Sequence, residues 1–175
     1  MQTILEIIKY TLPGLIVFAA VYYILRQYLN SQYELKRLEI KSNYSQQAIP
    51  LKLQAYERLL LFCDRISIPS LLLRLKNKEM SADQLKTAMI ISVQKEYEHN
   101  MAQQLYTSHK LWEILTLAKN DIITLISDAG SKVGPQATSQ ELSNELMNQL
   151  KTLKKSPESL GVQAIKEEAK IILNV

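Results

Sequence analysis

The stretch that decides the fold is residues 9–29, KYTLPGLIVFAAVYYILRQYL. Between Lys9 and Arg26 it holds 16 residues without a charge, and Thr11 is the only clearly polar side chain among them. A surface helix of a soluble protein keeps a polar stripe for water, and no such stripe can be drawn here. The segment is therefore expected to cross a membrane as a single helix.

The length of the run is at the lower end for a membrane span. Sixteen helical residues rise about 24 Å, whereas the hydrocarbon core is about 30 Å thick. Long basic side chains at the two ends close this gap by reaching the interface, and tyrosines favour the same layer. The predicted membrane-interface residues are Lys9, Tyr10, Tyr22, Tyr23, Arg26 and Tyr28.

A cleaved export signal and a soluble core helix are the alternatives. An export signal opens with a basic region and ends at small residues followed by a polar mature start. Here Glu6 balances Lys9, and the small pair at residues 19–20 is followed by five apolar or aromatic residues. Cleavage is therefore not expected. In the second alternative the protein is soluble and residues 10–25 belong to its core.

Basic residues near the span indicate its orientation. Only Lys9 precedes it, whereas Arg26, Lys36, Arg37 and Lys41 follow it. Basic flanks stay on the cytoplasmic side of a membrane. The N-terminus is therefore expected outside and the C-terminal domain in the cytoplasm.

The rest of the chain has a helical composition. It contains four Gly and five Pro in 175 residues, with none of either in residues 15–49, and straight-chain helix formers fill most of it. The spanning helix is expected to continue as a stalk until Pro50 starts a new helix. The predicted fold is all-α, with a transmembrane anchor (1–26), a helical stalk (27–48) and a cytoplasmic bundle of about five helices (49–175).

Helix starts in the bundle carry local capping signals. Thr107 or Ser108 precedes a helix that is expected to stop at Gly130. In a capping box, a serine or threonine before the helix is followed three residues later by Glu or Gln. Two such boxes are predicted, Ser81 with Gln84 and Thr138 with Glu141.

No set of residues typical of catalysis is found. Glu96 and His99 form an E-x-x-H pattern, which di-iron bundles use twice with two further glutamates. Here the pattern occurs once, so the two residues are interpreted as part of an exposed helix face rather than as metal ligands. The only cysteine, Cys63, excludes an internal disulfide, and its apolar neighbours are typical of an inert buried thiol. The protein is predicted not to be an enzyme and to use no cofactor or metal.

Charge is spread evenly along the chain. The 21 basic and 17 acidic residues give a net charge of +4 and are interleaved, so nucleic-acid binding is not expected. Three cations, Arg74, Lys76 and Lys78, end a short apolar helix. They are interpreted either as a solvated helix end or as candidate contacts to anionic lipid.

Two segments carry a family resemblance: IPLKLQAYERLLLFCDRISIPSLLLR (49–74) and EYEHNMAQQLYTSHKLWEILTLAKNDI (96–122). They are similar to an uncharacterised bacterial family of small single-pass membrane proteins, with an LQAYERL-type helix and a later HN..QQLY.S...W segment. The resemblance covers about residues 5–130. It implies membrane attachment and a helical cytoplasmic part, and it implies no activity.

Polar residues of these segments are the candidate partner surface: Glu57, Arg58, Arg65, Glu98, His99, Asn100, Gln103, Gln104 and Lys119. The alternative is that they are inter-helix pairs and caps within the bundle. We expect a membrane-anchored helical interaction or scaffold module, with membrane lipid as one partner and an unknown protein or a second copy as another. A membrane-associated enzyme of unrecognised type and the soluble all-α protein described above are the alternatives.

Overall fold

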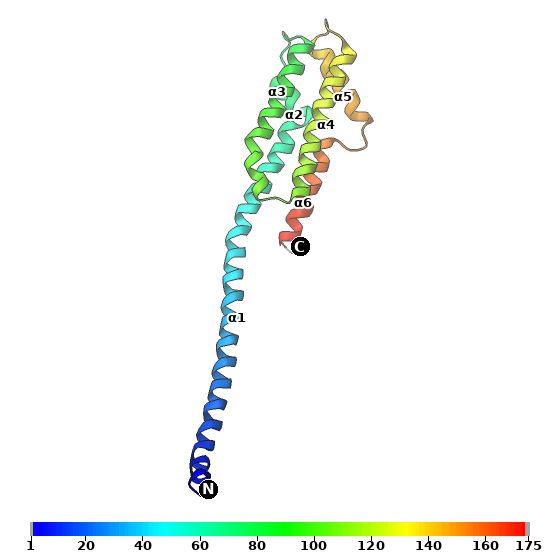
Figure 1. The fold of residues 1–175 in the computed structure, drawn as a ribbon. Coiled ribbons are helices and arrows are strands. Elements are labelled where there is room, and N and C mark those ends of the chain that lie inside the picture. Colours follow the sequence, from blue (N-terminus) through cyan, green and yellow to red (C-terminus); the bar gives the residue numbers. More distant parts are fainter. Residues whose placement is uncertain (1, 174–175) are drawn as a thin grey trace. The chain divides into compact units, whose positions relative to one another are not determined.

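The computed structural model describes the backbone of residues 2–173 and the side chains of residues 12–37, 39–40 and 48–173. Its helices, drawn in Figure 1, confirm the predicted all-α class. The chain divides into two compact units, Met1–Ala48 and Ile49–Val175. The first unit is helix alone, and the second is a helical bundle.

Six α-helices and one short 3-10 helix make up the described chain. They are α1 (Gln2–Ile66), α2 (Ile68–Leu75), α3 (Ala82–Asn100), η1 (Met101–Leu105), α4 (His109–Val133), α5 (Ser139–Thr152) and α6 (Pro157–Leu173). In the bundle α4 packs against α3, α5 and α6, and α3 also contacts α2 and α5. The last part of α1, from residue 49, contributes to the same unit.

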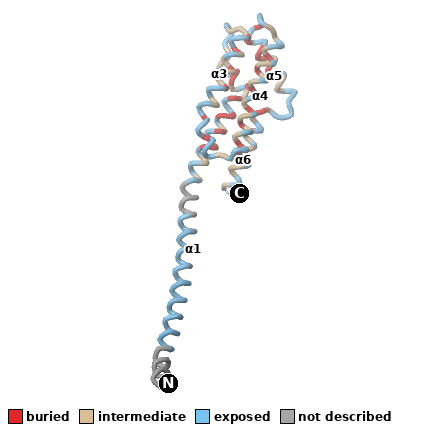
Figure 2. Tube along the Cα trace, viewed as in Figure 1, coloured by how far each residue is buried: buried red, intermediate tan, exposed pale blue. Residues whose placement is uncertain are grey.

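The first unit presents apolar side chains to its surroundings. None of the residues in Leu12–Arg37 is buried, and an 18-residue window of this segment has a mean hydropathy of 1.4. Figure 2 shows it as exposed along its whole length. In the described chain it is the one helical segment long and apolar enough to cross a membrane, judged by length and composition.

Two predicted helix boundaries are wrong. Pro50 does not start a new helix, because α1 continues through it to Ile66; a proline removes one helical hydrogen bond, and the residues around it hold the helix on both sides. Gly130 does not end α4, which continues to Val133. The helix is followed instead by Gly134, whose φ of 83° lies in the region that favours glycine.

The bundle encloses one apolar core, shown as buried segments in Figure 2. Apolar residues at steps of three and four along each helix turn inward, as expected for amphipathic helices. The most deeply buried large side chains are Leu59, Phe62, Ile66, Ile68, Leu71, Leu85, Met89, Leu111, Leu115, Ile122, Ile126 and Leu142. The bundle is thus held by side chains from α1 to α5, and Ile165 adds a buried contact from α6.

Both predicted capping boxes are confirmed. At the start of α3 the Ser81 hydroxyl accepts from the Gln84 amide (3.2 Å), and the Gln84 side chain accepts from the Ser81 amide (3.0 Å). Thr138 and Glu141 repeat this arrangement at the start of α5. There the hydrogen bonds from Thr138 lower the pKa of Glu141 below its ordinary value.

The starts of α3 and α5 are also joined to each other. The Ala82 amide donates to the Ala137 carbonyl (2.8 Å), and the Ser139 amide donates to the Met80 carbonyl (3.1 Å). These bonds form a short antiparallel bridge within an otherwise helical unit. Two helix N-termini therefore satisfy part of each other's free amide groups.

Candidate functional site

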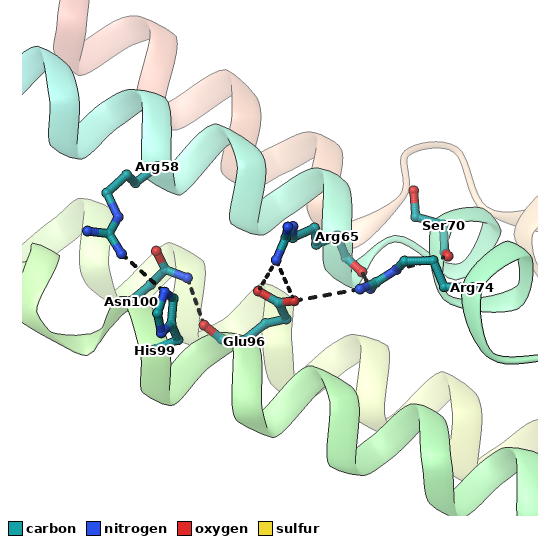
Figure 3. Close-up of polar contacts among 7 residues, drawn as sticks. All are labelled: Arg58, Arg65, Ser70, Arg74, Glu96, His99 and Asn100. Carbon is teal, nitrogen blue, oxygen red and sulfur yellow. Dashed lines mark hydrogen bonds and ion pairs between the residues drawn. The ribbon is translucent and has the colours of Figure 1, made fainter.

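Basic side chains from α1, α2 and α3 meet on one surface of the bundle, shown in Figure 3. Arg58 and Arg65 are seven residues apart on α1, so they lie two turns apart on the same face. Side chains of α2 and α3 face them. We call this the arginine surface, and it consists of Arg58, Leu61, Arg65, Arg74, Lys95, Glu96 and His99.

Glu96 on α3 lies at the centre of the arginine surface. Its carboxylate accepts from Arg65 Nη1 at 3.1 and 3.4 Å, and it forms an ion pair with Arg74 Nη1 at 3.6 Å. The Glu96 side chain is 14% exposed, whereas that of Arg65 is 57% exposed. The carboxylate thus lies beneath the guanidinium groups and holds them by charge-assisted hydrogen bonds.

Arg74 is fixed by further bonds to the backbone. Its Nη2 donates to the Arg65 carbonyl (2.6 Å) and its Nε donates to the Ser70 carbonyl (3.3 Å). The C-terminal end of α1 leaves carbonyl groups without helical partners, and Arg74 supplies a donor to one of them. Arg74 therefore joins the end of α1 to α2 and α3.

At the other end of the surface Arg58 contacts His99. Arg58 Nη2 lies 3.3 Å from His99 Nε2. A guanidinium group can only donate, so Nε2 is the acceptor in this contact. Both side chains are exposed. The neighbouring Asn100 side chain donates to the Glu96 carbonyl (2.8 Å), which keeps it within α3.

Two shallow hollows open on the arginine surface. One of about 190 Å³ includes Arg58, Leu61 and Glu96, and one of about 270 Å³ includes Lys95 and Glu96; Arg65 and His99 line both. Leu61 is 61% exposed although it is apolar. The surface therefore combines several hydrogen-bond donors with one exposed aliphatic side chain, which is a composition suited to binding an anionic group.

The structure places the predicted partner residues in different environments. Arg58, Arg65 and His99 come together on the arginine surface. Glu57 and Gln104 are exposed elsewhere on their helices, and exposed Glu98 accepts from Gln94 (3.0 Å) on its own helix.

Three of the predicted partner residues are buried or half-buried in the bundle. Asn100 and Gln103 are buried, at 5% and 9% exposed. Lys119 Nζ lies 4.6 Å from the centre of the Tyr97 ring, a cation–π contact between α4 and α3. The tyrosine hydroxyl in turn lies 3.0 Å from the Thr116 hydroxyl. These contacts match the alternative interpretation, in which polar side chains connect helices.

The predicted membrane-interface residues are only partly covered by the described structure. Tyr22, Tyr23 and Tyr28 are exposed on α1, as is Arg26. The side chains of Lys9 and Tyr10 lie outside the described residues. Contact of these residues with lipid stays a prediction.

The predicted lipid-facing cations have different surroundings. Arg74 is engaged on the arginine surface, and Lys76 donates to the Gln140 side chain on α5 (2.7 Å). Lys78 is exposed in the turn before α3. Contact of the three cations with anionic lipid stays a prediction.

Metal-ligating residues do not gather in the described part of the chain. No group of three or more His, Cys, Asp or Glu side chains is found there. Glu96 and His99, the E-x-x-H pair, are both bonded to arginines. Cys63 is fully buried, as predicted, and burial, followed by the nearby charge of Glu158, raises the pKa of its thiol to about 12.

The largest hollow among the described residues lies beside α6. Its volume is about 520 Å³, and apolar side chains such as Leu105, Ile114 and Ile171 form much of its wall. A second hollow of about 480 Å³ continues it between α4 and α6. We call the two together the α4–α6 groove.

Glu168 in this groove has a role that the sequence did not reveal. Its carboxylate accepts from the Tyr56 hydroxyl (3.1 Å), the Ser108 amide (2.9 Å) and the Ser108 hydroxyl. Burial, and then the charge of Glu168, raise the pKa of Tyr56. Because Ser108 is the N-cap of α4, Glu168 ties the start of α4 to α1 and α6. The Glu168 carboxylate therefore has a structural role in holding these helices together.

Comparisons with known proteins place the chain in a family without an assigned activity. A family model described as a family of unknown function (DUF7935) matches residues 2–172, so it includes both the apolar N-terminal helix and the bundle. No curated protein and no solved structure matches the chain. The resemblance to an uncharacterised family, expected from the two segments, is to that extent confirmed.

Proposed function

The chain belongs to the DUF7935 family of unknown function, and we propose that it is a membrane-anchored helical interaction module. In this proposal α1 spans the bilayer, and the bundle of residues 49–175 holds a partner near the cytoplasmic face. The supporting observation is the segment Leu12–Arg37, which is apolar and has no buried residue. Soluble monomers rarely expose an apolar surface of this extent.

The apolar side chains of this segment lie on every side of the helix. Residues 15–18 are four successive apolar residues, from Leu15, 65% exposed, to Phe18, 70% exposed. Successive helical residues are 100° apart around the axis, so these four point in all directions. A helix that is apolar all round is suited to a membrane or to the interior of a large core. Because the described segment has no core around it, the bilayer is the environment that accounts for it.

The basic residues after the apolar run support the proposed orientation. Arg26, Lys36 and Arg37 are exposed on α1, and a basic excess is retained on the cytoplasmic side. The bundle would then face the cytoplasm. A fluorescent protein that folds only in the cytoplasm, fused after Val175, should be bright, and a dark fusion would reverse the orientation.

Alkaline carbonate extraction of membranes tests the anchor. The full-length chain should stay in the pellet, whereas F18R/V21R should be released, because each arginine near the centre of a span costs about 2.5–3.5 kcal/mol. The matched control is L73R, which replaces a leucine that is 88% exposed on the bundle, and it should stay in the pellet. Release of the wild-type chain would instead support the soluble alternative.

The enzyme alternative draws on the α4–α6 groove, which is the largest hollow among the described residues. Its carboxylate Glu168 is occupied by a helix N-cap and a buried phenol. Lys52 and Lys110, which line the same hollow, have no hydrogen bond to Glu168 within the described structure. The groove therefore supports catalysis less well than the first unit supports anchoring.

A further inference from the structure

We propose that the arginine surface docks an acidic amphipathic segment of a partner protein, with one carboxylate against Arg58, one against Arg65 and an apolar side chain against Leu61. This inference deepens the proposed interaction function and rests on it. It names the chemistry of the partner and the part of the bundle that binds it. Its basis is the spacing and charge of Arg58 and Arg65, which Figure 3 shows, together with Leu61 and Lys95 on the same surface.

The spacing of the three α1 residues defines the complement. Arg58, Leu61 and Arg65 follow one another at steps of three and four, so they share one helix face. The two arginines are about 10 Å apart along the axis at 1.5 Å per residue. Leu61, 61% exposed, lies between them. A helical segment with acids seven residues apart and an apolar residue between them matches this pattern.

The charge of the surface exceeds what its own residues neutralise. Among the seven residues of the surface four are cations, Arg58, Arg65, Arg74 and Lys95, and one, Glu96, is a carboxylate; exposed Glu57 and Asp64 lie beside this surface on α1. Arg65 and Arg74 both bond to the Glu96 carboxylate, which leaves a positive excess on the outer side. Electrostatic complementarity of this kind guides the choice of partner and speeds its encounter.

The arginines are already held in place before a partner arrives. Glu96 fixes Arg65 from below, and His99 fixes Arg58 from the side. Ordering a long side chain at an interface costs about 0.5–1.5 kcal/mol, and here part of that ordering exists in the free protein. Arginine also matches a carboxylate with two parallel hydrogen bonds.

A compact phosphate group fits this surface less well than separated carboxylates. The point where Arg65 and Arg74 converge is occupied by Glu96. Arg74 spends its other donors on two backbone carbonyls. The outer donors of Arg58 and Arg65 are two helix turns apart, so one small anion cannot bridge them.

A flat anionic membrane also fits less well than a narrow protein segment. Glu57 and Asp64 are exposed on α1, one residue before Arg58 and Arg65 and therefore about 100° around the helix. Phe62, which contacts Tyr97 of α3, lies on the opposite side of the arginines. A broad negative surface would meet both carboxylates. A narrow segment that contacts the arginines and Leu61 passes beside them, because Leu61 is four residues from Glu57 and three from Asp64.

Site-specific photo-crosslinking in membranes tests the proposal with the full-length chain. A photo-reactive amino acid, benzoylphenylalanine, replaces Leu61, and the crosslinked peptides are sequenced. We expect a protein segment with acidic residues on both sides of the crosslinked position. The same probe at Leu117 in the α4–α6 groove, 60% exposed, provides the positional control.

Charge variants show whether the arginines create the contact. R58Q/R65Q should lower the crosslink yield at residue 61 at least about tenfold, in the range of a hot-spot loss. The matched control K166Q/K170Q removes the same charge from exposed positions on α6 and should leave the yield unchanged. Because Arg65 also holds Glu96, R58Q alone, which loses only an exposed contact, should lower the yield without altering the fluorescence of Trp112.

Each other outcome overturns the proposal. Crosslinks from residue 61 only to lipid, only to a second copy, or to segments without acids would do so, as would a yield that R58Q does not change. A partner crosslinked from residue 117 but not from residue 61 would leave the interaction module intact and refute the arginine surface alone. Release of the wild-type chain by carbonate would refute the anchor independently of these results.

Discussion

Replacing Glu168 should destabilise the bundle, although this residue lies on the last helix and is partly exposed. In Glu168→Ala the Tyr56 hydroxyl loses its acceptor. The amide and hydroxyl of Ser108, at the N-terminus of α4, lose the same acceptor. The variant thus removes hydrogen bonds that join α1, α4 and α6 to one another. The variant E168Q keeps the size of the side chain and removes its charge.

The expected loss of stability follows from the polar groups that E168A leaves without a hydrogen-bond partner. Tyr56 is 3% exposed, and an unpaired buried hydroxyl costs about 1–3 kcal/mol. The Ser108 groups are exposed, so water replaces part of what they lose. We expect E168A to lower the free energy of unfolding by about 2–3 kcal/mol, with a fall in Tm of about 5–15 °C. E168Q should fall between E168A and the wild type.

Trp112 provides a direct assay of this effect. It is the only tryptophan of the chain and is packed on Tyr97 with ring centres 5.4 Å apart. Its fluorescence in detergent micelles therefore reports unfolding of the bundle without a contribution from the apolar helix. Urea titrations followed at Trp112 give the free energy of unfolding for each variant.

Glu167→Ala is the matched control. Glu167 is exposed and accepts only from Gln163 on its own helix among the described residues, so E167A should change the free energy by less than about 0.5 kcal/mol. A cycle with Tyr56→Phe should give a coupling of about 1 kcal/mol. If E168A and E167A were equal, or if Y56F and E168A were additive, Glu168 would not join these helices as described.

Three further predictions concern local features. The pKa of Cys63 is raised from its ordinary 9.0 to about 12, so the protonated thiol contributes its full stability below pH 9, and that contribution falls as pH rises from 9 towards 12. In Cys63→Ala the free energy of unfolding, measured with urea, should therefore fall less steeply between pH 9 and 12. Equal slopes of this free energy against pH in the variant and the wild type would contradict the prediction. Ser81→Ala and Thr138→Ala should each cost about 1 kcal/mol, with Ser131→Ala on α4 as a neutral control, and a neutral effect of both would dismiss the capping boxes. Gly134→Ala and Gly134→Asn should each cost about 1–3 kcal/mol, because the φ of 83° with a ψ of 173° is a backbone region that only glycine adopts readily; a thermal melt that finds either replacement neutral would be inconsistent with this geometry.

Features set by neighbouring residues could be predicted from the sequence. The boxes at Ser81 and Thr138 need only a partner three residues away, and both were found. Single breakers were less informative. Pro50 lies inside a helix and Gly130 lies before the real end of one, because a single breaker costs about 1–3 kcal/mol and the hydrogen bonds of the remaining turns of a long helix outweigh it.

Contacts between distant segments could not be predicted. Glu168 and Tyr56 are 112 residues apart, and the pairing follows only from how α6 lies against α1. Arg65 is a candidate partner residue and Glu96 is part of an E-x-x-H pattern, but that the two pair with each other is visible only in the structure. Helical periodicity shows which residues share a face, but the neighbour of that face is decided by the packing of the bundle.

The bridge between the starts of α3 and α5 gives the bundle an internal reporter of its own opening. First-turn amides of a helix normally exchange their hydrogens with water rapidly, because they have no acceptor within the helix. The amides of Ala82 and Ser139 bond instead to carbonyl groups on each other's segment. Neither can exchange until the two helix starts separate, so their exchange rates should follow each other and measure how often this end of the bundle comes apart.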